Sequence, residues 1–149
     1  MQIYRRNVLA SAAAALSGVF ALGAARAAPA LPDKSKAVYH LDDLDKVNFV
    51  LGNIENHYNG VGGPEHVTIA LVVHGPALKA FHAIEASAET AQKVAGFSKA
   101  GLGLNACGNT MKAQKVTLQD LLPGFVEARQ GGVVRIAELQ SQGYVYLRP

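Results

Sequence analysis

The only cysteine of the chain, Cys107, lies at a predicted junction between a strand and a helix. The apolar run before it, residues 102–106, predicts a strand, and Gly108, Asn109 and Thr110 are residue types that form turns and helix N-caps. Backbone N–H groups and the positive end of a helix dipole favour a thiolate at such a position. The sequence therefore predicts a sulfur nucleophile at Cys107. A buried cysteine acting as a small hydrophobic residue is the alternative.

Three other polar side chains occur at or near the ends of predicted strands: His40, His74 and Arg129. In an open parallel sheet, ligands bind beyond the carboxyl ends of the strands, so these residues and Cys107 are predicted along one rim. His74 is the stronger histidine candidate, because His-Gly-Pro turns the chain beside the sheet edge. For His40 a hydrogen-bonded loop or capping role is favoured. The strand order, which the sequence does not give, decides which of them are neighbours.

Three chemistries fit a rim with one thiol and two imidazoles. A metal site could use Cys107 with His40 and His74, but no CxxC or HxxxH spacing supports it. A Cys–His hydrolase needs an orienting acid and an oxyanion hole, and the nearby aspartates are interpreted as helix-starting residues: Asp42, Asp43 and Asp45. Sulfur transfer requires only an accessible thiolate, an amide-rich or positive environment and a partner. The lack of a second cysteine argues against a dithiol cycle.

Sulfur transfer is therefore the preferred chemistry, with Cys107 as the sulfur-bearing residue and His74 and His40 as its helpers. Five residues around the two turns and the rim are candidates for contacting the substrate: Gly75, Gly108, Asn109, Thr110 and Arg129. No metal and no cofactor are expected. The alternative is a non-catalytic binding module that holds a metal or a small anion through His74 and Cys107. The remaining histidines are predicted at the solvated surface: His57, His66 and His82.

The first 27 residues have the pattern of a cleaved export signal. Arg5 and Arg6 precede an uncharged apolar run that ends in Ala25-Arg26-Ala27, which predicts a twin-arginine-like signal and a periplasmic protein without stable membrane insertion. Its removal takes the 14 basic residues down to 11, equal to the 11 acidic residues. The net charge of +3 thus belongs to the signal, and the remaining chain has no basic footprint for nucleic acid.

The rest of the chain predicts one α/β domain over residues 37–149 after a flexible leader, residues 28–36. Five strands are expected, at residues 37–41, 66–75, 102–106, 125–128 and 144–147. The second is apolar throughout, which is typical of a parallel strand buried on both faces. Helical segments are expected between the strands: 42–58, 76–83, 87–99, from 109, 117–120 and 131–142. This alternation predicts a mainly parallel sheet with helices on both faces.

The chain resembles the DsrE/DsrF-like, or YchN-like, proteins of sulfur metabolism. The resemblance covers the whole predicted domain and rests on five blocks: Lys36-Ala-Val-Tyr-His40, Leu51-Gly-Asn-Ile-Glu-Asn-His57, Val72-Val-His-Gly75, Ala106-Cys-Gly-Asn-Thr110 and residues 139–149. It implies a three-layer, flavodoxin-like α/β/α fold and a homo-oligomer, either a trimer or a hexamer. It also implies that Cys107 matches a cysteine that carries a persulfide between sulfurtransferases. For this chain, the expected partner is a sulfur donor or acceptor protein or a small sulfur anion. The export signal departs from the cytoplasmic members of that family, so the fold transfers better than the substrate does.

Overall fold

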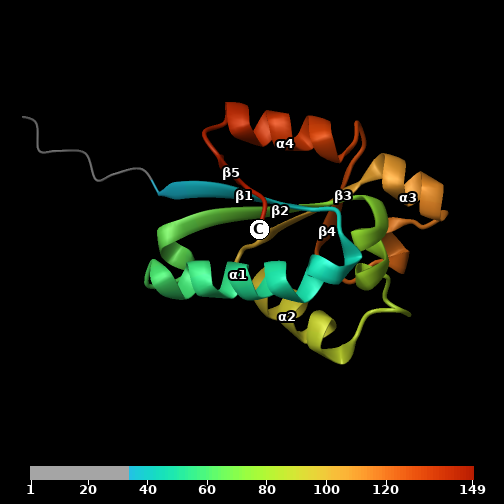
Figure 1. The fold of residues 1–149 in the computed structure, drawn as a ribbon, viewed down its shortest axis with the longest axis horizontal. Coiled ribbons are helices and arrows are strands. Elements are labelled where there is room, and N and C mark those ends of the chain that lie inside the picture. The colour runs from blue at the N-terminus through green and yellow to red at the C-terminus, as the bar shows by residue number, and fades with distance from the viewer. Residues whose placement is uncertain (1–33) are drawn as a thin grey trace, which may run out of the picture. The chain divides into compact units, whose positions relative to one another are not determined.

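The computed structural model describes residues 34–149 and contains one five-stranded sheet (Figure 1). All neighbouring strands pair in parallel, in the order β4-β3-β2-β1-β5. The strands are β1 (Ser35–Leu41), β2 (Val67–Val73), β3 (Gly103–Cys107), β4 (Phe125–Ala128) and β5 (Val145–Leu147). The predicted parallel sheet is confirmed, and β2 is buried along almost its whole length, as expected.

The connections explain why helices cover both faces of this sheet. The helices are α1 (Val47–Gly60), α2 (Ala88–Lys99), α3 (Gly108–Gln114) and α4 (Gly132–Ser141), with short 3-10 segments η1 (Leu44–Lys46), η2 (Pro64–His66), η3 (Gly75–Phe81) and η4 (Leu118–Asp120). The chain steps in one direction from β1 to β4 and then returns past β1 to form β5. Because parallel crossovers are right-handed, this reversal moves the last connection to the opposite face. Figure 1 shows α4 on one face and α1 and α2 on the other.

The fold is therefore a three-layer α/β/α architecture of the flavodoxin-like kind. In the flavodoxin strand order, 2-1-3-4-5, the chain reverses after its second strand. Here it reverses after β4, so the switch point lies between β1 and β5. Ligand sites of open α/β sheets lie at such switch points, beyond the carboxyl ends of the strands.

The two faces of the sheet differ in how much apolar surface they bury. The larger cluster lies between the sheet and the α1/α2 layer and includes Tyr39, Leu51, Leu71 and Phe81. The smaller cluster lies under α4: Val38, Ala70, Val72, Ile136 and Leu139. A polar contact also holds α4 in place, since the Arg135 guanidinium donates to the side chain of buried Asn105 at 2.9 Å.

The start of the first strand and the buried faces of two helices differ from those that the sequence predicts. Strand β1 begins at Ser35, so the last two residues of the predicted leader belong to the sheet. The three- and four-residue spacing of five apolar residues predicts a buried stripe on the first helix: Leu44, Val47, Leu51, Ile54 and Tyr58. Leu51 is fully buried, but Leu44 is 43% exposed. Leu44 belongs to η1, a 3-10 turn capped by the Asp43 side chain, which changes the direction of the side chain relative to α1. The sequence of the last helix also predicts an amphipathic helix with Val133, Val134, Ile136, Ala137 and Leu139 as its apolar residues. Of these, Ile136 and Leu139 are buried in α4, whereas Val133 and Val134 are exposed.

The predicted export signal, residues 1–27, and the first part of the predicted leader lie outside the described residues. Among residues 34–149, no helix has both the length and the apolar character needed to span a membrane.

Two leucines that the sequence pattern treats alike allow the burial assignment to be tested. We expect Leu51→Ala to lower the free energy of unfolding by about 2–5 kcal/mol, since it removes a fully buried side chain from the larger core. The matched change Leu44→Ala should cost less than about 1 kcal/mol, because that side chain is largely in water. Urea unfolding of both variants measures the difference. Equal losses would contradict the observed end of the buried stripe.

Candidate functional site

Cys107 is the last residue of β3 and the N-cap of α3. Cys107 is 6% exposed and forms no disulfide. The hydroxyl and the backbone N–H of Thr110 and the backbone N–H groups of Asn109 and Gly132 lie near the sulfur and favour its charged form. Asn109 and Thr110 begin α3, whereas Gly132 begins α4. The thiol therefore lies where the N-terminal ends of two helices meet.

These contacts decide the acidity of the thiol. Burial alone raises the pKa of Cys107, because it penalises the charged thiolate. The nearby N–H and O–H donors of Thr110, Gly132 and Asn109 act in the opposite direction and together outweigh burial, so the pKa of Cys107 lies below its ordinary value. The predicted thiolate-favouring environment is thus present. It comes from directed N–H and O–H donors of two helices, not from α3 alone.

Two glycines permit this close packing. A Cβ on Gly132 would lie 3.3 Å from the Cβ of His74 and 3.4 Å from the Cβ of Cys107. The start of α4 therefore fits between these two side chains, which also places His74 beside the cysteine. A Cβ on Gly108 would lie 3.1 Å from the carbonyl oxygen of Ala128. Gly108, a predicted substrate contact, is buried against the end of β4.

A chain of hydrogen bonds through Gly75 and Gln114 connects the Thr110 hydroxyl to His82. The Thr110 hydroxyl accepts from the backbone N–H of Gly75 at 2.9 Å, and the carbonyl of Gly75 accepts from the Gln114 amide at 2.9 Å. The Gln114 side-chain oxygen in turn accepts from His82 at 2.8 Å. Gly75 has a φ of 58°, a left-handed conformation that suits glycine. His82 is 7% exposed, so its predicted surface position is wrong: it supports the turn from the core.

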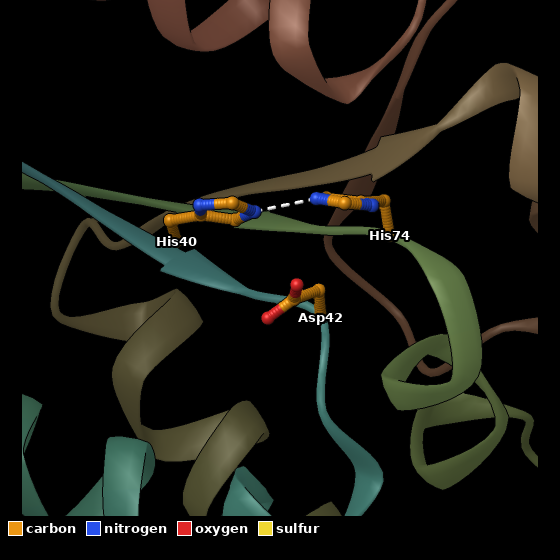
Figure 2. Close-up of side chains that lie close together, drawn as sticks. All are labelled: His40, Asp42 and His74. Carbon is orange, nitrogen blue, oxygen red and sulfur yellow. Dashed lines mark hydrogen bonds between the residues drawn. The ribbon is translucent and has the colours of Figure 1, made fainter. Parts of the chain in front are cut away.

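His40 and His74 come together beside this site. His40 lies within β1, so the expected loop role does not apply, and His74 directly follows β2. Their Nε2 atoms are 2.5 Å apart, and the two rings are nearly coplanar, with 21° between their planes and 4.7 Å between their centroids. Figure 2 shows the rings edge to edge, with the carboxylate of Asp42 beside the gap. The donor atoms of all three side chains lie within 4.8 Å of one another.

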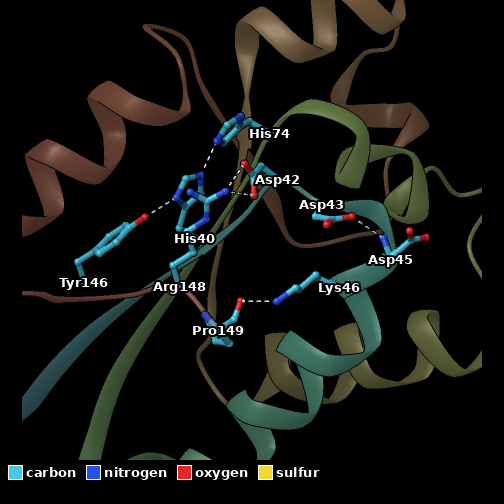
Figure 3. A network of polar contacts seen from close by, with 9 residues as sticks. All are labelled: His40, Asp42, Asp43, Asp45, Lys46, His74, Tyr146, Arg148 and Pro149. Atoms are coloured by element: carbon cyan, nitrogen blue, oxygen red, sulfur yellow. Dashed lines mark hydrogen bonds and ion pairs between the residues drawn. The ribbon is translucent and has the colours of Figure 1, made fainter.

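The C-terminal residues complete this cluster (Figure 3). The Tyr146 hydroxyl forms a 2.7 Å hydrogen bond with Nδ1 of His40, and the Arg148 guanidinium donates to both carboxylate oxygens of Asp42 at 2.8 and 3.1 Å. Burial lowers the pKa of His40, and the neighbouring His74 lowers it further. The Asp42 carboxylate opposes this shift and Arg148 adds to it. His40 is therefore held as a neutral imidazole near neutral pH.

The predicted rim is only partly assembled. His40 lies on β1, His74 directly follows β2 and Cys107 ends β3, and these three strands are adjacent in the sheet. Arg129 follows β4, but its side chain is 88% exposed, and its ion-pair contact is with Glu127 at 3.8 Å. It lines a hollow of about 280 Å³, together with Asn105, Glu127, Arg135 and Glu138. Cys107 is not among the residues that line this hollow. Asn109 is exposed at the start of α3.

Three members of the cluster carry no motif that identifies them: Asp42, Tyr146 and Arg148. The interpretation of Asp42 as a helix-starting residue is wrong, because Asp43 is the N-cap and Asp42 faces the histidines. One signal for Asp42 is present in the sequence. Alternate residues of a strand share a face, which puts His40 and Asp42 on the same side. For Tyr146 and Arg148 no comparable signal exists, since their contacts depend on β5 pairing with β1.

Comparison with known proteins supports the fold. The sequence matches no protein-family model and no curated protein. Among solved structures, the chain is similar to MTH1491 of Methanobacterium thermoautotrophicum, a protein of unknown function. The two share 26% sequence identity with a TM-score of 0.67, over 77% of this chain and 99% of that chain. This neighbour has a similar architecture and brings no activity with it.

The role of Thr110 in setting the acidity of the thiol can be tested directly. We expect Thr110→Val to raise the pKa of Cys107, because the isosteric side chain cannot donate to the sulfur. Thr110→Ser keeps the hydroxyl and should stay close to the wild type. Ultraviolet absorbance of the thiolate followed against pH gives the midpoints, with Cys107→Ser as the blank. A midpoint unchanged by Thr110→Val would show that the hydroxyl does not stabilise the thiolate.

Proposed function

We propose that this protein is a sulfur carrier in which Cys107 holds sulfane sulfur as a persulfide. One observation supports this more than any other: N–H and O–H donors at the starts of two helices lie near the sulfur, and its pKa is lowered despite burial. Such an environment favours the thiolate, which is the attacking species in sulfur exchange. Because a single cysteine has no resolving partner in the chain, it suits the carriage of a sulfur atom better than a dithiol cycle.

The proposed step needs no separate oxidant. The Cys107 thiolate attacks the terminal sulfur of a donor persulfide, R–S–SH; a new sulfur–sulfur bond forms at Cys107, the donor bond breaks, and R–S⁻ leaves. With thiosulfate as donor, the same attack transfers the outer sulfur and releases sulfite. With thiosulfate the product is the persulfide anion Cys107–S–S⁻. With R–S–SH it is Cys107–S–SH, which becomes the same anion when its proton passes to the departing R–S⁻. The anion is stabilised by the donors of Thr110, Asn109 and Gly132.

His74 is the side chain best placed to assist Cys107. It lies across Gly132 from the cysteine and forms a hydrogen bond with His40, whose other ring nitrogen contacts Tyr146. We propose that this row of groups takes up or supplies the proton that accompanies donor binding and release. The exposed guanidinium of Arg129, on the same edge of the sheet, would attract an anionic donor by its charge without touching the thiol.

The proposal includes the setting in which the carrier works. We propose that the chain is exported to the periplasm by the signal-like residues 1–27, and that it exchanges sulfur there with a partner protein or a small sulfur anion. We also propose a homo-oligomer, a trimer or a hexamer. Large apolar side chains exposed on the single chain support self-association: Phe49, Ile84, Val126, Val133 and Val145. Sedimentation velocity over a range of concentrations tests this part, and a monomer at the highest concentration would refute it.

Intact-mass measurement tests the carrier function. After incubation with thiosulfate or with polysulfide, we expect the wild type to gain mass in whole sulfur atoms, and dithiothreitol to remove the gain. Cys107→Ser should gain none. His74→Ala should load more slowly. His66→Ala is the matched control, because His66 precedes the amino-terminal end of β2, opposite the rim, and its side chain is 59% exposed.

Access to the buried sulfur is measured in the same samples. Alkylation of Cys107 by iodoacetamide in native buffer, compared with the rate in urea, shows whether reagents reach the thiol in the folded state. A thiol that alkylates natively but gains no sulfur from any donor would refute the carrier function. A thiol that reacts only after denaturation would assign Cys107 a structural role.

A further inference from the structure

We propose that His40, Asp42 and His74 form a binding site for a borderline divalent transition-metal cation, for which Zn²⁺ is the probe. The proposal does not depend on persulfide chemistry, because Cys107 takes no part in the site. It also differs from the metal site that the sequence suggests as an alternative, which uses the thiol.

The donor set and its geometry support the proposal. Two imidazole nitrogens and one carboxylate oxygen lie within 4.8 Å of one another. Metal–ligand bonds of about 2.0–2.2 Å place neighbouring donors of a tetrahedral zinc site roughly 3.3 Å apart. The two Nε2 atoms, 2.5 Å apart, therefore have to separate by roughly 0.8 Å when an ion binds. Imidazole suits zinc, copper, iron and nickel. Two histidines and a carboxylate leave a further coordination position open for water or a substrate.

The orientation of the two rings is the observation that favours a cation most. The nearly coplanar rings point their Nε2 atoms at each other (Figure 2), so one proton lies between them in the metal-free state. A cation that replaces this proton binds both lone pairs at once, with each ring carrying its hydrogen on Nδ1. For His40 that hydrogen then points to the Tyr146 hydroxyl, already 2.7 Å away. Such a partner for the outer ring nitrogen is usual for histidine ligands of metals.

The position of the cluster in the fold gives it access to solvent. It lies at the carboxyl ends of β1 and β2, next to the switch point between β1 and β5 where open α/β sheets bind ligands. A small hollow of about 100 Å³ opens beside it and is lined by His40, Asp42, Lys46, Arg148 and Pro149 among others. An ion can reach His40 and Asp42 through this hollow without rearrangement of the core.

Arg148 is the group that opposes a cation, because it holds the Asp42 carboxylate. The Arg148 side chain is more than half exposed, and surface ion pairs contribute little to stability, so the guanidinium can turn into solvent when an ion binds. The site therefore predicts an unusual response: removing this positive charge should strengthen zinc binding. A merely structural cluster of hydrogen-bonded side chains predicts no such gain.

Calorimetric titration of the untagged full chain with ZnCl₂ tests the site. We expect one ion per chain, and no competition from an equal concentration of Mg²⁺, which prefers oxygen ligands. His40→Ala and Asp42→Asn should each weaken binding by more than tenfold, and Tyr146→Phe by roughly tenfold, the usual loss when the partner of a ligand is removed. Arg148→Gln should tighten binding. His66→Ala and Cys107→Ser should bind like the wild type.

The two matched controls decide how the result is interpreted. If His40→Ala binds zinc as tightly as His66→Ala, the cluster is a pair of histidines that share a proton, and the proposal is overturned. If Cys107→Ser loses binding as fully as His40→Ala, the ion sits on the thiol and the proposal is again overturned. Asp42→Asn keeps the shape of the side chain, so it keeps the test valid if His40→Ala disturbs folding, which circular dichroism reveals. Since Cys107→Ser abolishes sulfur loading, the two proposals succeed or fail separately.

Discussion

The parallel register of β1, β2 and β3 is the constraint on which the rest of the site depends. Leu41 pairs with Val73, and Val73 pairs with Ala106, so the residues that follow each of them form one row. That row is Asp42, His74 and Cys107. Because the side-chain period of a strand is two, a shift of one residue in any of these pairings would turn one member of the row to the opposite face. Backbone pairing thus brings a carboxylate, an imidazole and a thiol together, although they are far apart in sequence.

Helix α4 has two functions in this arrangement. It buries the smaller apolar cluster through Ile136 and Leu139, and its first residue brings a backbone N–H to the sulfur of Cys107. Both require the helix to approach the sheet closely, which the missing side chain of Gly132 permits. Stability and the environment of the thiol are therefore coupled. A residue larger than glycine at position 132 would move α4 away from the sheet and would move the backbone N–H away from the sulfur of Cys107.

The reversal of the chain after β4 determines which groups surround His40. It sends β5 to the free edge of β1, where Tyr146 lies beside Val38 in the register and reaches His40. The same strand carries Arg148 to Asp42. The thiol site and the histidine cluster are consequently built from different connections. The first comes from two crossover helices, and the second from the last strand of the chain. This separation is the physical reason why the thiol and the histidine cluster have different supporting elements on one edge of the sheet.

The sequence by itself determined the elements and the position of Cys107. Apolar runs with β-branched residues, capping residues and glycines act within a few residues of themselves, so β2, β4, α2 and the junction at Cys107 follow from local rules. The acidity of the thiol also follows in direction, because helix N-termini favour a thiolate. Only the tertiary structure decided the partners. The burial of His82, the contact of Asp42 with the histidines and the exposure of Arg129 depend on strand order and on which face each connection crosses, and these are set by packing over the whole chain, which no local pattern records.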